Sequence, residues 1–182
     1  VSGTILEIGS GEGYGVTELA PKSTKYIAVD KYDSPISKKV KDNNNIEFKQ
    51  MNVPPLQGIV ENSIDYVVTF QVIEHIQNDV QFIKEIYRVL KPGGKLILTT
   101  PNLLMSLSRN PWHTREYTPQ SMRDILEISF ADIEMNGVFG NEKIMQYYNA
   151  NKKSVERIRK WDIFNLEKNM PRRLLQVPYD IL

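Results

Sequence analysis

The run Gly9-Ser10-Gly11-Glu12-Gly13-Tyr14-Gly15 follows directly on a short apolar segment, Thr4–Ile8. Glycines at this density let the backbone turn sharply and let a ligand approach main-chain amides. A dinucleotide-binding fingerprint needs its third glycine three positions after the second, where this chain has Tyr14. Glu7, just before the loop, suits a cationic ligand better than a pyrophosphate. The run therefore predicts a ligand-holding loop between a strand and a helix, with a plain strand-to-helix turn as the alternative.

An acid stands at the end of the next apolar run. Asp30 closes Tyr26–Asp30 and follows Gly11 by 19 residues. A carboxylate at this place can accept two hydrogen bonds from ribose hydroxyls. Taken alone, an aspartate at a strand end is more often a turn residue or a helix cap, so its interpretation depends on the glycine loop.

The chain has two histidines, and each lies in a segment with other polar residues. His75 follows Gln71 and Glu74, and all three share a face if this segment is helical. His113 lies in Asn110–Tyr117. An imidazole titrates near neutral pH, so His113 is our candidate for a general base that deprotonates a hydroxyl. The alternative for both histidines is packing within a loop.

Short aliphatic runs alternate with helical patterns, which predicts an α/β fold with a mostly parallel sheet flanked by helices. Apolar residues at helical spacing predict a helix over Asp79–Leu90, which Lys91-Pro92-Gly93-Gly94 ends. Thr118 caps a second helix, which begins at Pro119 and runs to about Ser129. We expect strands at Thr4–Ile8, Tyr26–Asp30, Ile46–Met51, Asp65–Phe70, Lys95–Thr100 and Ala131–Phe139.

The pattern changes from Asn141 onward, where Ile144–Trp161 is helical in pattern and rich in Lys and Arg. Residues 1–140 carry 14 Lys and Arg against 17 Asp and Glu, whereas residues 141–182 carry 9 against 5. We expect residues 1–140 to form a ligand-binding core and residues 141–182 to form a helical, mildly basic extension of the same domain. A solvated helix face explains the basic charge most simply.

Four motifs in this order resemble the class I S-adenosylmethionine (SAM)-dependent methyltransferases, in particular the ubiquinone-biosynthesis type. Besides the glycine loop and Asp30, Ile64–Ile76 resembles their fourth strand with the segment after it, and Phe82–Asn102 resembles the next helix, turn and fifth strand. The resemblance implies a Rossmann-like, doubly wound sheet of seven strands, the last one antiparallel. The pattern contains no seventh strand before Leu182 and no helix before the first strand, so we expect a chain truncated at both ends.

The resemblance also implies SAM as the cofactor. The glycine loop would line its methionine end, and Glu7 would anchor the loop and the cofactor's amino group. Asp30 would bind the ribose, and Asn52 would accept from the adenine amine in place of the more usual aspartate. The full predicted set adds the neighbours of the adenine and of the methionine: Glu7, Gly9, Ser10, Gly11, Gly13, Asp30, Lys31, Tyr32, Asn52, Val53, Phe70 and Gln71.

Methyl transfer from a sulfonium is a direct displacement, so the protein must align the reactants and sometimes remove a proton. We assign the catalytic role to His113. Alternatively, Glu74, His75 and His113 would hold a divalent metal, which resembles the Glu-x-x-Glu-His segment of ubiquinone-pathway O-methyltransferases and small-RNA 2′-O-methyltransferases. Gln71 replaces the first glutamate, and a neutral amide binds a hard cation less well than a carboxylate does, so we expect no metal.

The segment around His113 and the charge of the chain bear on the acceptor. Residues 110–117 resemble bacterial methyltransferases of sugar and surface-polysaccharide pathways. Trp112 and Tyr117 could form an apolar substrate wall, and Arg109 and Arg115 could pair with a substrate phosphate or carboxylate. We therefore expect O-methylation of a small-molecule or sugar acceptor, such as a glycan precursor. The net charge of +1 disfavours a nucleic-acid partner.

Three other functions stay open at this point. They are an RNA 2′-O-methyltransferase, a SAM-binding module without catalysis, and a nicotinamide-dependent reductase, which Tyr14 opposes.

Composition sets the remaining bounds. A chain of 182 residues with 41% hydrophobic and 25% charged residues predicts one globular domain. The absence of cysteine excludes disulfides, thiolate nucleophiles and iron–sulfur clusters. No apolar run approaches the roughly 20 residues of a membrane span, and no signal peptide opens the chain. We expect a cytoplasmic location, and the pattern predicts no oligomeric state.

Overall fold

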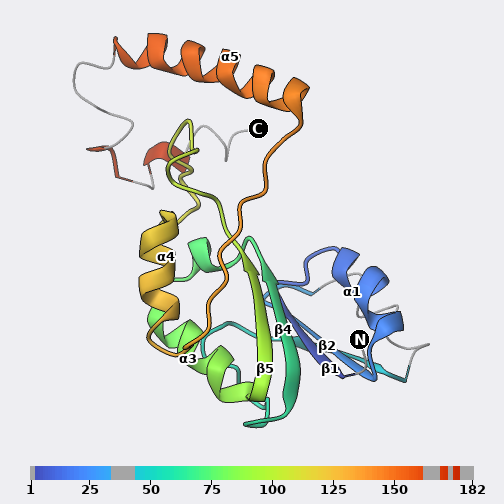
Figure 1. Cartoon of the computed structure of the whole chain (residues 1–182). Helices are drawn as coiled ribbons and strands as arrows, with labels where there is room; N and C mark the ends of the chain where they lie inside the picture. The colour runs from blue at the N-terminus through green and yellow to red at the C-terminus, as the bar shows by residue number, and fades with distance from the viewer. Residues whose placement is uncertain (1–2, 34–43, 162–168, 172–173, 177–182) are drawn as a thin grey trace.

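A five-stranded sheet in which every pairing is parallel forms the centre of the computed structural model, which describes residues 3–33, 44–161, 169–171 and 174–176 (Figure 1). The strands lie in the order β3-β2-β1-β4-β5. The expected mostly parallel, Rossmann-like sheet flanked by helices is thereby confirmed. The bounds are β1 Thr4–Ile8, β2 Lys25–Asp30, β3 Ile46–Gln50, β4 Ile64–Phe70 and β5 Leu90–Thr99.

The order of the strands reverses at β1. The chain moves outward from β1 through β2 to β3 and then continues on the other side with β4 and β5. Ile8 at the end of β1 is level with Val29 of β2 and with Thr69 of β4. The loops that follow these three strands therefore begin at one edge of the sheet, at the switch point where ligands bind in doubly wound folds.

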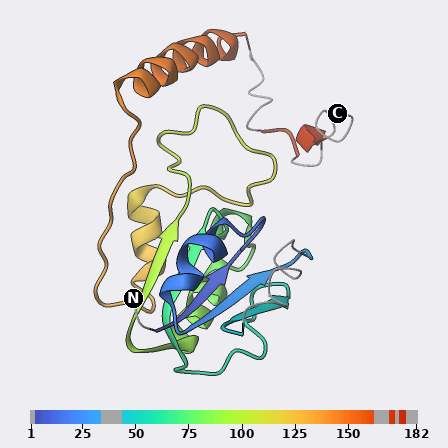
Figure 2. The ribbon, with the colours of Figure 1, turned by 90° about the vertical axis from the view of Figure 1, so that its right-hand side faces the viewer.

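Helices cover both faces of the sheet (Figures 1 and 2). Helix α1 (Tyr14–Leu19) and the turn η1 (Ala20–Lys22) lie on one face, where Val16 and Ala20 pack on Tyr26. Helices α3 (Asp79–Val89) and α4 (Pro119–Leu126) lie on the other face and enclose the larger core.

Helices α3 and α4 form where the sequence predicts them. In α3 the apolar stripe Phe82, Ile83, Ile86 and Val89 is fully buried, and the Asn78 side chain caps the first turn by accepting from the Gln81 amide. Helix α4 begins with the predicted Thr118–Pro119 start, and Thr118 and Ser121 form a reciprocal capping box. This helix ends at Leu126, before the predicted Ser129.

Strand β5 begins earlier than predicted, at Leu90 instead of Lys95. Leu90 pairs with Ile64, and the next pair, Tyr66 with Lys95, follows only after a register shift. Residues 91–94 therefore bulge out of the ladder instead of forming a turn before the strand. β5 is an edge strand of the described sheet, and an edge tolerates Pro92, which has no amide hydrogen to donate.

One other predicted element is wrong. No strand forms at Ala131–Phe139, which runs as irregular chain beside the sheet. Ile133 and Met135 still pack against the core, so the apolar pattern reflects burial without a hydrogen-bonded ladder. The condition under which Gln71, Glu74 and His75 would share a helical face is not met, because Gln71 is left-handed, with φ of 57°, and only a 3₁₀ turn follows, η3 (Ile73–His75).

Helix α5 (Glu142–Arg159) confirms the predicted helix in the basic segment and lies beyond the carboxyl edge of the strands in both views (Figures 1 and 2). Among the described helices, none is both long enough and apolar enough to cross a membrane.

Candidate functional site

The glycine loop turns the chain sharply at the end of β1. Gly9, Gly11 and Gly13 all have positive φ, at 80°, 46° and 85°. A Cβ at Gly9 would lie 2.3 Å from a methyl of Val72, so no other residue fits there. A Cβ at Gly11 would meet nothing within 4 Å, so the loop presents bare backbone to open space.

Asp30 ties the glycine loop to the end of β2. One carboxylate oxygen accepts from the Gly11 amide at 2.8 Å and the other accepts from the Tyr32 amide at 3.0 Å. The Met51 amide donates to the Asp30 carbonyl at 2.8 Å, which brings the segment after β3 alongside. The 19-residue spacing between Gly11 and Asp30 thus corresponds to a direct contact.

A pocket of about 470 Å³ opens between these loops and the loop after β4. It contains eight of the twelve predicted cofactor residues: Gly9, Asp30, Lys31, Tyr32, Asn52, Val53, Phe70 and Gln71. The remaining lining was not predicted and is mostly apolar: Ile8, Val29, Met51, Val72, His75 and Ile76. Ile8 is the last residue of β1 and Val29 precedes the last residue of β2, and these positions near the strand ends were their only signal in the sequence.

The other four predicted cofactor residues do not line this pocket. Gly11 and Gly13 form the outer part of the loop. The Ser10 hydroxyl is buried and has no hydrogen-bond partner among the described residues, so it is an unsatisfied polar group within the loop. A ligand amino or carboxylate group could satisfy it.

Glu7 is buried beneath the loop and does not reach the pocket. Its carboxylate accepts a 2.8 Å hydrogen bond from the Tyr26 hydroxyl and lies where a Cβ at Gly15 would otherwise stand. Burial raises the pKa of Glu7 from 4.5 to about 7, the Tyr26 hydrogen bond partly opposes this rise, and the nearby Asp30 adds to it. In this structure Glu7 supports the loop from behind.

Gln71 holds the chain at the other side of the pocket. Its amide donates to the Thr99 carbonyl at 2.9 Å and its side chain donates to the Thr99 hydroxyl at 3.2 Å. These bonds fix a left-handed backbone that non-glycine residues adopt at some energetic cost.

The two histidines lie edge to face, with ring centroids 5.0 Å apart. His75 Nδ1 lies 3.1 Å from the Trp112 carbonyl oxygen, so this nitrogen carries the proton. His113 Nε2 lies 2.9 Å from the Asn110 side-chain amide, and its Nδ1 lies 2.7 Å from a Glu116 carboxylate oxygen. Because the amide of Asn110 donates, His113 Nε2 has the lone pair and Nδ1 donates to Glu116. His75 lines the pocket and His113 does not.

Glu74, His75 and His113 place one possible ligand atom each within 4.8 Å of one another. One oxygen of the buried Glu74 carboxylate accepts from Thr100, and the other has no partner among the described residues. A divalent ion could use this oxygen. Both ring nitrogens of His113 are already engaged, so a metal would have to displace a hydrogen bond.

The loop from Asn102 to Tyr117, which carries His113, is closed at its base. The Leu103 amide donates to the Tyr117 carbonyl at 2.8 Å. The Tyr117 hydroxyl donates to the buried Asp79 at 2.9 Å, and Arg115 pairs with the same carboxylate. Tyr117 is therefore a core residue and does not form the predicted substrate wall, whereas the Arg115 side chain stays half exposed beside Asp79.

Trp112 and Arg109 have different surroundings. Trp112 is half exposed, as a substrate wall would require. The Arg109 guanidinium donates to the Met170 carbonyl at 3.0 Å, so this cation contacts the described part of the tail.

Comparison with known proteins adds to this geometry. A model of the methyltransferase domain family matches residues 6–98. A probable S-adenosylmethionine-dependent methyltransferase of Mycolicibacterium smegmatis is 35% identical over 141 residues, which are 74% of this chain and 54% of that protein. The ubiquinone biosynthesis O-methyltransferase of Rickettsia felis is 33% identical over 102 residues, 54% of this chain and 41% of that protein. The chain spans about half the length of the curated relatives that it matches.

Solved structures share the fold. An S-adenosylmethionine dependent methyltransferase from Mesorhizobium loti superposes with a TM-score of 0.67 at 12% identity and covers 84% of this chain and 85% of its own. A 1,6-didemethyltoxoflavin-N1-methyltransferase from Burkholderia thailandensis, solved with S-adenosylhomocysteine, has a TM-score of 0.60 at 18% identity and covers 70% and 60%.

Proposed function

Because this chain belongs to the methyltransferase domain family and its relatives are SAM-dependent, we propose that it transfers the methyl group of SAM to an oxygen atom of a small-molecule or glycan-precursor acceptor. One observation supports the cofactor site above all. The Asp30 carboxylate lies at the mouth of the pocket and holds the bare backbone of Gly11 at 2.8 Å.

The residues at the pocket fit this cofactor. The buried Ser10 hydroxyl lacks a partner among the described residues, and Gly11 faces open space, so a ligand can approach the backbone of the loop. Asp30 offers acceptors to the ribose, and Asn52 offers an amide oxygen to the adenine amine. Bound SAM supplies an electrophilic methyl group on a sulfonium.

The protein's own part in the reaction is to orient the acceptor and to remove its proton. His113 is the proposed proton acceptor. Glu116 fixes its tautomer by accepting from Nδ1, which leaves the Nε2 lone pair basic. In this structure Asn110 donates to that lone pair, so an acceptor hydroxyl must replace the Asn110 amide.

Oxygen is the favoured acceptor atom because the ubiquinone biosynthesis relative is named an O-methyltransferase. The proposed division into a core of residues 1–140 and an extension of the same domain fits the covered sheet and the outlying α5.

The test is a titration followed by a turnover assay. Calorimetry with SAM and with NADH should show heat for SAM alone. Release of S-adenosylhomocysteine over a panel of sugar, phenol and amine acceptors then identifies the acceptor. Preference for NADH would end the methyltransferase proposal, and SAM binding without turnover on any acceptor would favour a module without catalysis.

A further inference from the structure

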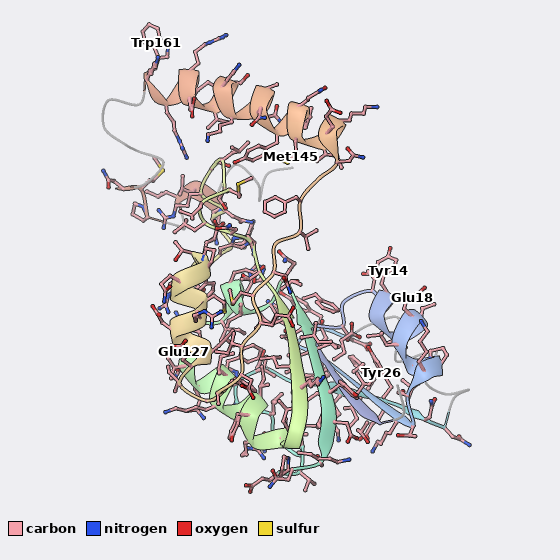
Figure 3. All side chains as sticks on the ribbon, in the orientation of Figure 1. Tyr14, Glu18, Tyr26, Glu127, Met145 and Trp161 are labelled. Atoms are coloured by element: carbon pink, nitrogen blue, oxygen red, sulfur yellow. The ribbon has the colours of Figure 1, made fainter. Side chains whose placement is uncertain are left out.

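Helix α5 carries exposed apolar side chains that no other described element covers. None of its residues is buried, and Ile144, Tyr147 and Ile158 are 57%, 71% and 70% exposed. At 3.6 residues per turn these three side chains fall within an arc of about 60°. Trp161, directly after the helix, is 84% exposed and points away from the rest of the chain in Figure 3. We call Ile144, Tyr147, Ile158 and Trp161 the α5 face.

A neighbouring side of the helix contacts the body of the protein. The Tyr148 hydroxyl donates to the Met105 carbonyl at 3.0 Å, and Met145 and Val155 are partly buried. The α5 face therefore stays exposed after the helix has made its described contacts with the 102–117 loop.

Cations border the α5 face. Residues 142–161 contain six Lys and Arg and two Glu, a net charge of +4. All six cations are in exposed residues. By helical geometry, Lys143 and Arg157 lie on the side of the apolar arc away from Tyr148, and Lys152 and Arg159 lie on the side that also carries Met145 and Tyr148.

We propose that α5 docks on an anionic lipid surface. The α5 face enters the boundary between headgroups and acyl chains, and the bordering cations meet the lipid phosphates. The charge argues against a second copy of this chain as the occupant, because two helices of +4 would repel each other. A nucleic acid would use the cations but would leave Trp161 and Ile158 in water. Lipid is the partner that accommodates both kinds of side chain.

Docking through α5 also orients the protein. The helix lies beyond the carboxyl edge of the strands, the edge that holds the pocket (Figures 1 and 2). The pocket would then open near the lipid surface. This inference stands on α5 alone and does not depend on the proposed methyl transfer.

The experiment is co-sedimentation of the purified chain with vesicles of phosphatidylcholine alone and with added phosphatidylglycerol. We expect binding only to the anionic vesicles, with loss of binding as salt rises from about 0.1 M to about 1 M. Lys143→Glu with Arg157→Glu should lower vesicle binding tenfold or more, and Ile158→Ser with Trp161→Ser should lower it to a similar extent. Circular dichroism checks that each variant folds.

Matched controls place equivalent changes on the body of the protein. Lys22→Glu with Lys84→Glu makes the same charge change at exposed sites outside α5, and Val60→Ser removes an apolar side chain that is 71% exposed. Both should bind vesicles like the wild type.

Three results would overturn the proposal. Equal binding to neutral and anionic vesicles, or binding to neither, rejects docking on an anionic lipid surface. A loss of vesicle binding in the control variants as large as in the α5 variants shows nonspecific attraction between the protein and the vesicles. A dimer in solution that Ile158→Ser with Trp161→Ser makes monomeric assigns the face to a second copy. SAM calorimetry on the same preparation reports separately on the proposed function.

Discussion

Replacing Asp30 tests the proposed cofactor site most directly. Its carboxylate accepts two backbone amides, from Gly11 at 2.8 Å and Tyr32 at 3.0 Å, and it is the proposed partner of the ribose. Asp30→Ala removes all of these acceptors. A lost hydrogen bond to a charged group costs about 1.5–3 kcal/mol, which corresponds to a roughly 10- to 150-fold rise in the Kd for SAM.

A graded series sharpens this prediction. Asp30→Asn keeps one acceptor oxygen and replaces the other by a donor, so it should hold one of the two amides and give an intermediate Kd. Asp33→Asn makes the same charge change at an exposed position in the same loop and should leave the Kd within about twofold of the wild type.

The assay is isothermal calorimetry with SAM and with S-adenosylhomocysteine. An unchanged Kd in Asp30→Ala would show that the ribose lies elsewhere. An equal loss in Asp33→Asn would show that the loop's overall charge, and not the contact with Asp30, governs binding.

Three further predictions concern other parts of the site. The pKa of Glu7 rises from 4.5 to about 7 on folding, so folding disfavours the ionised form of Glu7. As the pH rises from 4.5 to 7, the unfolding free energy of the wild type should therefore fall by up to about 3 kcal/mol relative to that of Glu7→Gln, measured by urea titration. The same pH dependence in both proteins would contradict this. His113→Ala should lower kcat by about 10²- to 10⁴-fold with little change in the Kd for SAM, whereas a loss confined to SAM binding would reject the base role. Methyl transfer should survive EDTA, and a loss that Mg²⁺ restores would assign a metal to Glu74, His75 and His113.

Strands and the glycine loop were predictable because their signals are local. Thr4–Ile8 is apolar and nearly all of it is buried, so the run predicted a central strand with correct ends. Gly9 must be glycine, because Val72 occupies the space of a Cβ. The spacing from Gly11 to Asp30 was informative because β2 runs parallel to β1, so the two strands end at the same edge of the sheet.

The remaining details depend on contacts between segments that the sequence separates. Glu7 resembled a residue that faces the cofactor, but the phenol of Tyr26 and the bare Cα of Gly15 hold its carboxylate below the loop. His75 reaches the pocket because Gln71 adopts a left-handed backbone and bonds to Thr99, so the segment after β4 does not continue as a helix. Neither partner can be identified from spacing along the chain.

The closed base of the 102–117 loop separates the tip of the loop from the sheet. The bond from Leu103 to Tyr117 and the attachment of Tyr117 to Asp79 hold both ends in place, whatever lies between them. The entropy of closing a loop grows only slowly with its length. Related chains can therefore lengthen or replace residues 104–112 without altering strand β5 or helix α4.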